Sequence, residues 1–489
     1  MKRLSIIFVA VVLACGIQVA QAQSSYEEYA RKRKAGYEAY KTQKAEGIKR
    51  YNEEKNREYA RRMSERWEYH QLSKGIVPPP SPDPVTPPEV VPDTPPAPPK
   101  EVAPEDTPMV IPEPTPAPQE EITPPVVEPK SEQKYVYVNY YGSKIRIAYT
   151  PAMVRRMTDC NESGVAAAWS HLSEGSSNLW LKELFNLRKE LSLCDWAYYK
   201  LVEKASVALL GEGNDATLLQ VFTLVQSGLK VRMGHEDGNL RLLYPSTMNL
   251  YGYSYLPIDG MKYFVMTDGQ VGGLFIYDSI FPGEQLPSAQ ITIPLLANTP
   301  TQKQPHAAKK YPNVAVVAGT NFNVIDYYNE CPRNTSWQYY ANANLSEGLK
   351  EQVYPTLRRE IEGLSAKDAA NVLINFVQTG FEYKTDDAQF GYERPLYGDE
   401  MFYYAFSDCE DRSILYSILV RDLLGLDVVL LHFQNHLATA VHFPSEVEGD
   451  YLMVGGKKYI ICDPTYINAS IGMTMPSVEG KLQNIIALN

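Results

Sequence analysis

A proline-rich stretch divides this sequence more sharply than any other feature. Between Pro78 and Pro129, 21 of the 52 residues are proline, interspersed with valine, threonine and acidic residues. Proline lacks the backbone N–H that helices and sheets use, so this segment cannot pack a core and favours extended polyproline II. At ~3.1 Å per residue, it could hold its two ends up to roughly 160 Å apart. We therefore predict a disordered linker over residues 76–133.

The residues before this linker repeat with a period of eleven. The four units between Tyr26 and Tyr69 are YEEYARKRKAG, YEAYKTQKAEG, IKRYNEEKNRE and YARRMSERWEY. This period corresponds to ~3.67 residues per helical turn, which keeps the first residue of each unit on one stripe. We predict one long charged helix over residues 23–75, with an aromatic seam. Such a helix suits a protein partner, a coiled coil or a membrane surface, or it is simply solvated.

The first 22 residues have the layout of a secretory signal peptide. A basic pair, Lys2-Arg3, precedes an apolar run over residues 4–14, and small residues suited to cleavage end at Ala22. We expect export to the periplasm or cell envelope of a bacterium. An alternative is a lipoprotein, because the residues before Cys15 resemble a lipobox; lipid on this cysteine would give peripheral membrane association.

Charge and cysteine content limit the function further. The chain has 47 basic and 58 acidic residues, a net charge of −11, which gives no basic patch for nucleic acid.

Export permits disulfides, and an odd number of cysteines follows Cys15, so at least one thiol stays unpaired or bonds another chain. The pairing stays open among the remaining cysteines, which are Cys160, Cys194, Cys331, Cys409 and Cys462.

Folded structure is expected to begin at about Lys134 and to be α+β. Over residues 134–312 we predict a mixed α+β module without catalytic spacing. It starts with a hairpin in which YVYVNY and KIRIAY flank a turn, and it continues with helices to about residue 230 and short strands to about 298. A polar, proline-bearing stretch then marks a boundary before a second domain over residues 313–489.

In this second domain, one helix carries the first candidate site residue. Ser407 and Glu410 have capping-box spacing and predict a helix start there, with Gly425 closing the helix. Cys409 then lies in the first turn, where free N–H groups and the helix dipole favour a thiolate.

Two later strands carry candidate partners for this thiol. The strand HLATAVHF opens with His436, and the strand KYIICDP ends at Asp463 with Cys462 pointing to the opposite face. If the strands pair, His436 can take the thiol proton while Asp463 orients its ring. The sequence therefore predicts a Cys409-His436-Asp463 catalytic triad.

The motifs SDCEDRSIL, NHLATAVHF and YIICDPTY, in this order, resemble the transglutaminase-like superfamily. The resemblance covers about residues 345–470. It implies a papain-like C-terminal domain, in which a helix with an N-terminal cysteine packs on an antiparallel sheet. It also implies that Cys409 is the nucleophile, His436 the general base and acid, and Asp463 the residue that orients the histidine.

The DCED motif is also similar to that of bacterial transglutaminase-like cysteine proteinases, some of which use calcium. This resemblance implies Ca²⁺ ligands at Asp408 and Glu410, whereas the alternative is that these acids cap the helix. Without a cation, their charges oppose the thiolate. The superfamily's oxyanion-hole tryptophan is missing, so the Cys409 N–H is one candidate donor, and Gln389 and Tyr392 are candidates for the other.

We therefore expect an exported transglutaminase-like cysteine hydrolase, a peptidase or amidase that cleaves a peptide or protein substrate through an acyl-thioester on Cys409. No cofactor is required by this chemistry, although Ca²⁺ is the one suggested by the acidic residues. The alternative is a non-enzymatic envelope binding or scaffold protein that uses a transglutaminase-like fold.

Overall fold

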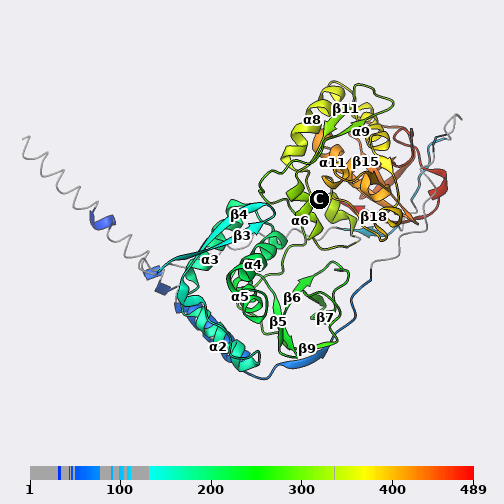
Figure 1. Ribbon diagram of the computed structural model, residues 1–489. Coiled ribbons are helices and arrows are strands. Elements are labelled where there is room, and N and C mark those ends of the chain that lie inside the picture. Colours follow the sequence, from blue (N-terminus) through cyan, green and yellow to red (C-terminus); the bar gives the residue numbers. More distant parts are fainter. Residues whose placement is uncertain are drawn as a thin grey trace, which may run out of the picture.

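The computed structural model describes residues 31–34, 43–44, 46–47, 50–77, 90–91, 98–103, 107–111, 132–334 and 336–488. Over these residues the protein is mixed α+β, as predicted (Figure 1). The expected signal peptide, Cys15 and parts of the eleven-residue repeats before residue 50 lie outside the described residues. No helix in the described ranges is long and apolar enough to cross a membrane.

The middle module contains a hairpin, a group of helices and a sheet. The hairpin joins β3 (Lys134–Tyr140) to β4 (Ser143–Tyr149) through Tyr141 and Gly142, both at positive φ, as in the tight turns that suit a twisted ladder. The helices are α2 (Glu162–Ser173), α3 (Asn178–Glu190), α4 (Asp195–Leu210) and α5 (Asn214–Gln226). These elements confirm the predicted order of a hairpin followed by helices.

The module's sheet is antiparallel throughout, in the order β1-β9-β5-β6-β8-β7. Its strands are β1 (Glu68–Gln71), β5 (Arg232–Glu236), β6 (Asn239–Ser246), β7 (Tyr255–Ile258), β8 (Met261–Val265) and β9 (Gly273–Tyr277). Strand β1 comes from the predicted charged helix, which therefore does not run to residue 75. The helix ends at residue 63, and the chain then pairs with β9.

The last turns of the repeat helix, residues 50–63, pack on this module through one apolar face. Asn56, Tyr59, Ala60 and Met63 are buried at helical spacing. The Tyr59 ring lies 5.0 Å from that of Trp169 in α2, and its carbonyl accepts a hydrogen bond from the Tyr277 hydroxyl. This part of the helix is thus built into the module, and of the two seam residues that the structure describes, Tyr59 is buried and Tyr51 is exposed.

The described residues of the proline-rich stretch include several that pair with or pack against the C-terminal sheet. Strand β2 (Met109–Val110) pairs in parallel with β18 (Leu482–Ala487), and Glu101 bridges to Tyr451. Val102 and Ala103 pack against the sheet's second core cluster. The predicted disordered linker is therefore wrong for these residues, since apolar side chains between the prolines give them a surface to bury against.

The C-terminal part has a six-stranded sheet in the order β16-β17-β15-β14-β18-β2, antiparallel except for the β18–β2 pair. Besides β2 and β18, its strands are β14 (Val428–Phe433), β15 (His436–His442), β16 (Tyr451–Val454) and β17 (Lys457–Cys462).

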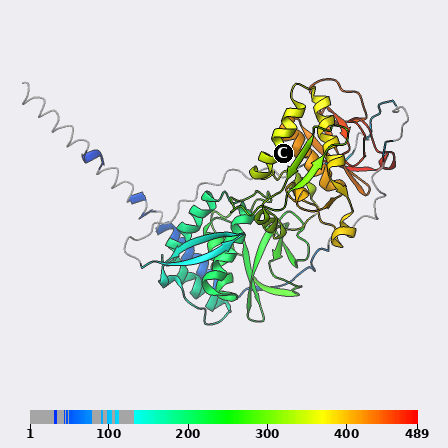
Figure 2. The same ribbon diagram turned by 45° about the horizontal axis from the view of Figure 1, so that its top comes forward.

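The helices of this part are α6 (Phe322–Asn329), α7 (Trp337–Ala341), α8 (Glu347–Ile361), α9 (Ala366–Gly380), α10 (Asp386–Phe390) and α11 (Cys409–Leu424). Helix α11 packs against β15 and β14, and α9 packs on α11. Figure 2 shows these helices beside the strands.

Two short ladders complete the fold, and one core joins its parts. Strands β10 (Gln304–Ala307) and β11 (Ala315–Ala318) form an antiparallel ladder across the predicted boundary at residue 312. Strands β12 (Glu382–Tyr383) and β13 (Phe406–Ser407) pair in parallel just before α11.

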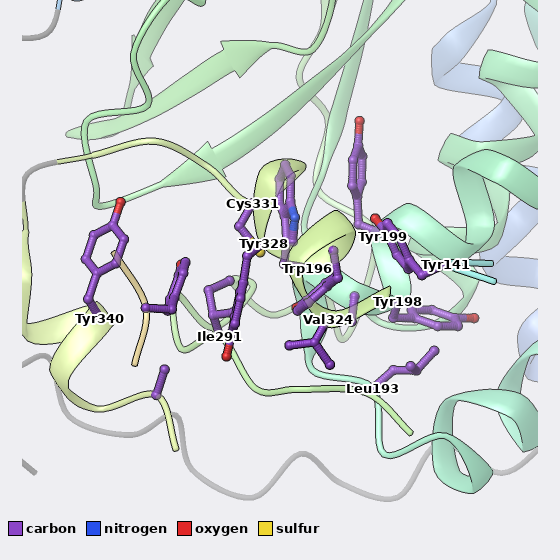
Figure 3. Close-up of a cluster of buried hydrophobic side chains, with 14 of the residues drawn as sticks. Tyr141, Leu193, Trp196, Tyr198, Tyr199, Ile291, Val324, Tyr328, Cys331 and Tyr340 are labelled. Carbon is purple, nitrogen blue, oxygen red and sulfur yellow. The ribbon is translucent and has the colours of Figure 1, made fainter. Parts of the chain in front are cut away.

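One hydrophobic core joins the two parts of the protein. In Figure 3, Tyr328 and Cys331 lie among aromatic side chains of α4, and these residues belong to the same buried cluster. The predicted module and domain therefore share a core.

Candidate functional site

Cys409 is the first residue of α11, at the helix N-terminus as predicted. The cap is displaced by one residue, however: Asp408 is the N-cap, and it forms the capping box with Asp411. The Asp408 N–H donates to Asp411 Oδ2 at 3.2 Å. The predicted Ser407–Glu410 box is wrong because Ser407 belongs to β13, where its backbone pairs with β12 and its hydroxyl accepts from Arg412. Helix α11 ends at Gly425 in the left-handed conformation, as predicted.

The structure brings His436 and Asp463 together beside this thiol. His436 Nε2 lies 2.9 Å from Asp463 Oδ2, and both side chains are buried. The β15–β17 ladder ends at the Thr439–Cys462 pair, so Asp463 lies beyond it, whereas His436 is still paired with Phe433 of β14. Within the paired strands the alternation holds: Cys462 faces the main core, away from Ile461 on the other face.

Cys409 and Asp463 act on the same imidazole. Burial lowers the pKa of His436, but the Asp463 carboxylate and the nearby Cys409 raise it more strongly, to about 10. His436 Nδ1 is buried and has no hydrogen-bond partner in the described structure. The Asp463 carboxylate is itself held, since its Oδ1 accepts from the Thr465 N–H at 2.9 Å and the Tyr466 N–H at 3.2 Å. These contacts orient the ring of His436 through Nε2 and leave Nδ1 without a partner.

A buried group of carboxylates lies next to Cys409. Oxygen atoms of Asp386, Asp408 and Glu410 all lie within 4.8 Å of one another. Cys409 Sγ donates to Glu410 Oε2 at 3.2 Å, and the Asp386 N–H donates to Asp408 Oδ2 at 3.3 Å. Asp408 thus caps the helix and also joins the group that was predicted as metal ligands. Asp386 is an addition, because no sequence pattern connects it to residues 22 positions later.

Burial and mutual repulsion govern the protonation of these acids. Burial, with the charges of Asp408 and Asp411, raises the pKa of Asp386 to about 11. Burial and Asp408 likewise raise the pKa of Glu393 to about 7, and the pKa of Glu410 lies well above its usual value. Asp408 Oδ1 and Glu410 Oε1 are buried without hydrogen-bond partners. The group therefore either retains protons or requires a cation.

This donor set fits a hard divalent cation. Two oxygens on one Ca²⁺ ion, each bound at ~2.4 Å, can be at most about 4.8 Å apart. The three carboxylates meet this limit, and two of their oxygens have unused lone pairs pointing into a buried site. Oxygen-only donors are the ligands that Ca²⁺ prefers. The acids beside Cys409 are thus suited both to capping and to cation binding.

Tyr383 is a polar residue that the sequence analysis missed. Its hydroxyl is buried without a hydrogen-bond partner. Tyr383 pairs with Ser407 just before α11, and its ring lies 5.2 Å from the Arg412 guanidinium, one turn after Cys409. Burial, followed by the charge of Cys409, raises the pKa of Tyr383. The ring of the predicted donor Tyr392 lies under Arg333 instead. The pairing of β12 with β13 brings Tyr383 to the start of α11, and the sequence analysis did not predict this pairing.

Comparisons with known proteins do not assign this chain. No family model, no curated protein and no solved structure matches it. The geometry of the site and the motifs that carry its residues are therefore what indicate a function.

Proposed function

We propose that the protein is an exported transglutaminase-like cysteine hydrolase that cleaves an amide bond through an acyl-thioester on Cys409. One observation supports this most strongly: His436 Nε2 is hydrogen-bonded to Asp463 at 2.9 Å, its Nδ1 has no partner in the described structure, and Cys409, which starts a helix, is near enough to raise the pKa of His436. A buried histidine that is oriented by a carboxylate and lies beside a thiol is the arrangement that activates cysteine nucleophiles. The packing of α11 on an antiparallel sheet agrees with a papain-like domain.

The proposed reaction uses these three side chains in order. His436 takes the Cys409 proton, and the thiolate attacks the amide carbon to form a tetrahedral oxyanion. The C–N bond then breaks as His436 returns the proton to the leaving amine, which leaves an acyl-thioester. Water, deprotonated by His436, attacks this thioester, and the acid product leaves as the thiol is restored. Asp463 stabilises the imidazolium that forms in both halves. Water is the only second substrate needed, so hydrolysis is favoured over cross-linking.

Two donors are proposed for the oxyanion. The Cys409 N–H lies at the first position of α11, where backbone N–H groups have no partner within the helix. The Tyr383 hydroxyl has no partner in the described structure and is near Cys409. A donor that is held in place before the reaction stabilises the oxyanion more than one that must reorganise. We therefore assign the second donor to Tyr383 in place of Gln389 and Tyr392.

We also propose a Ca²⁺ site formed by Asp386, Asp408 and Glu410. In the structure, Cys409 donates to Glu410, a contact that holds the thiol proton away from His436. A bound cation would neutralise the carboxylates and draw Glu410 toward itself. Cys409 would then lose its hydrogen bond to Glu410 and could give its proton to His436, so the cation would favour the thiolate.

The Ca²⁺ proposal predicts stabilisation that depends on Asp408. Ca²⁺ at a hundred times its Kd should stabilise the full chain by about 2.7 kcal/mol, since it binds only the folded protein. The melting temperature in CaCl₂ and in EGTA measures this effect. Asp408→Asn should remove it, whereas Asp387→Asn, at an exposed neighbour of the site, should respond like the wild type. An equal response of Asp408→Asn and the wild type would reject the site.

The nucleophile proposal predicts rapid alkylation of Cys409 at low pH. An ordinary thiol is mostly protonated at pH 6, so iodoacetamide should modify Cys409 at that pH only if His436 takes its proton. We expect His436→Ala to slow this reaction about tenfold or more, as measured by peptide mapping. His442→Ala, on the same strand and bonded to the Lys458 carbonyl, is the matched control. A rate unaffected by His436→Ala would favour the scaffold alternative.

The proposed location is the bacterial periplasm or cell envelope, on the basis of residues 1–22, with lipidation of Cys15 as the alternative. The proposed partners are a peptide or protein substrate and a protein that binds the repeat helix. Residues 50–63 of that helix are packed on the middle module, so the partner would bind the repeats before them.

A further inference from the structure

The Gln378 side chain binds the segment that carries Asp463. Gln378 lies on α9 and is 1% exposed. Its Nε2 lies within hydrogen-bond distance of the carbonyl oxygens of Asp463 at 3.2 Å, Tyr466 at 2.7 Å and Ala469 at 3.1 Å, so one of its two N–H groups is shared between two carbonyls. One amide group, 85 residues earlier in the sequence, thus gathers three carbonyls of a single loop.

This loop sets the direction of the Asp463 carboxylate. Its N–H groups at Thr465 and Tyr466 hold Oδ1, which leaves Oδ2 for His436. Gln378 bonds the carbonyls of Asp463 and Tyr466, so it holds both ends of this turn. A shift of the loop would therefore move Asp463 Oδ2, the oxygen that His436 contacts.

The same end of α9 is tied to the helix that carries Cys409. Arg412, one turn after Cys409, donates to the Gln378 carbonyl at 3.3 Å and to the Phe381 carbonyl at 2.9 Å. These bonds satisfy carbonyls at the end of α9 that have no partner within the helix. The end of α9 therefore connects the nucleophile helix and the Asp463 loop.

The unused half of the Gln378 amide argues against a role in core packing alone. Its Oε1 is buried without a hydrogen-bond partner in the described structure. A buried acceptor without a partner costs about 1–3 kcal/mol, which methionine or leucine at this position would avoid. The three bonds of Nε2 are what an apolar side chain could not supply. From these contacts we infer that Gln378 is a positioning residue of the site, which holds Asp463 against His436. The inference rests on the proposed function.

Alkylation of Cys409 tests this inference at two pH values. At pH 6 the reaction with iodoacetamide depends on the pairing of His436 with Cys409, and hence on Asp463; at pH 10 an ordinary thiol is largely ionised without help. We expect Gln378→Met in the full chain to slow alkylation at pH 6 about fivefold to tenfold, the effect of losing hydrogen bonds to this loop. The rate at pH 10 should stay within about twofold of the wild type.

Three further variants make the result decisive. Asp463→Asn should lower the rate at pH 6 at least as much as Gln378→Met. Asn375→Leu removes a buried amide on the same helix that bonds the Lys310 N–H, and it should not change the ratio of the two rates. Gln378→Asn keeps a polar amide but is too short to reach the loop, and it should behave like Gln378→Met.

The outcomes separate the two proposals. If Asp463→Asn reacts like the wild type at pH 6, the proposed function fails. If Asp463→Asn is slow but both Gln378 variants keep the wild-type ratio, only the positioning role fails. If both Gln378 variants are unfolded by thermal melting while Asn375→Leu is folded, Gln378 serves the whole fold, and the positioning role is also rejected.

Discussion

Replacing Cys409 with alanine is expected to abolish amide hydrolysis by the full chain. The substitution removes the sulfur that forms the proposed acyl-thioester, and His436 and Asp463 cannot replace it. The rate should fall by at least about 10³, because the remaining groups only bind substrate and stabilise the oxyanion. The measurement is incubation with a peptide library, with CaCl₂ present, followed by mass spectrometry of newly formed N-termini.

The control for this variant is Cys462→Ala. Cys462 is also buried, on β17, and its side chain faces the main core, so its loss should leave cleavage unchanged. In the same assay, Tyr383→Phe should lower the rate about 10²-fold, the usual effect of removing one oxyanion donor. Cleavage that persists in Cys409→Ala would exclude the cysteine hydrolase and leave the scaffold alternative.

Truncating Tyr59 to alanine is expected to destabilise the middle module by about 3–5 kcal/mol, the range for removing a buried aromatic ring. Tyr59 is 4% exposed, and its ring packs against Trp169, Tyr277 and Phe281. The loss would leave a cavity between the repeat helix and α2. Urea denaturation, together with hydrogen exchange of residues 50–63, measures the effect.

Tyr51 provides the matched control for this substitution. It belongs to the same helix but is 59% exposed, so Tyr51→Ala should change the free energy of unfolding by less than about 0.5 kcal/mol. Equal effects of the two substitutions would contradict the conclusion that this part of the helix belongs to the module.

Local signals in the sequence were sufficient for the elements that carry the site. Capping residues predicted the start of α11 to within one residue, and the error arose because β12, which pairs with the residues before α11, is too short to recognise. Strand alternation predicted that Cys462 and Asp463 lie on opposite faces; the structure shows Cys462 and Ile461 in different core clusters, and Asp463 lies beyond the ladder. The predicted α+β class and the hairpin at Lys134 are also confirmed.

Contacts between distant segments could not be predicted in the same way. Asp386, Tyr383 and Gln378 reach the site from elements that precede α11, and no periodicity in a single sequence connects them to it. The proline-rich stretch was misread for a related reason. Its composition excludes a core of its own, but it does not exclude burial of a few apolar side chains on a sheet formed by residues much later in the chain.

The path of that stretch affects the order in which the protein can fold during synthesis. Strand β2 is synthesised before β3 and everything that follows in the middle module, whereas its neighbour β18 is made only after α11 and β14 to β17. Strand β2 therefore stays without its partner while all the chain between them is synthesised, and it can join the C-terminal sheet only after β18 has appeared. Prolines on both sides of β2 cannot donate backbone hydrogen bonds, which limits wrong pairing by this segment during that interval.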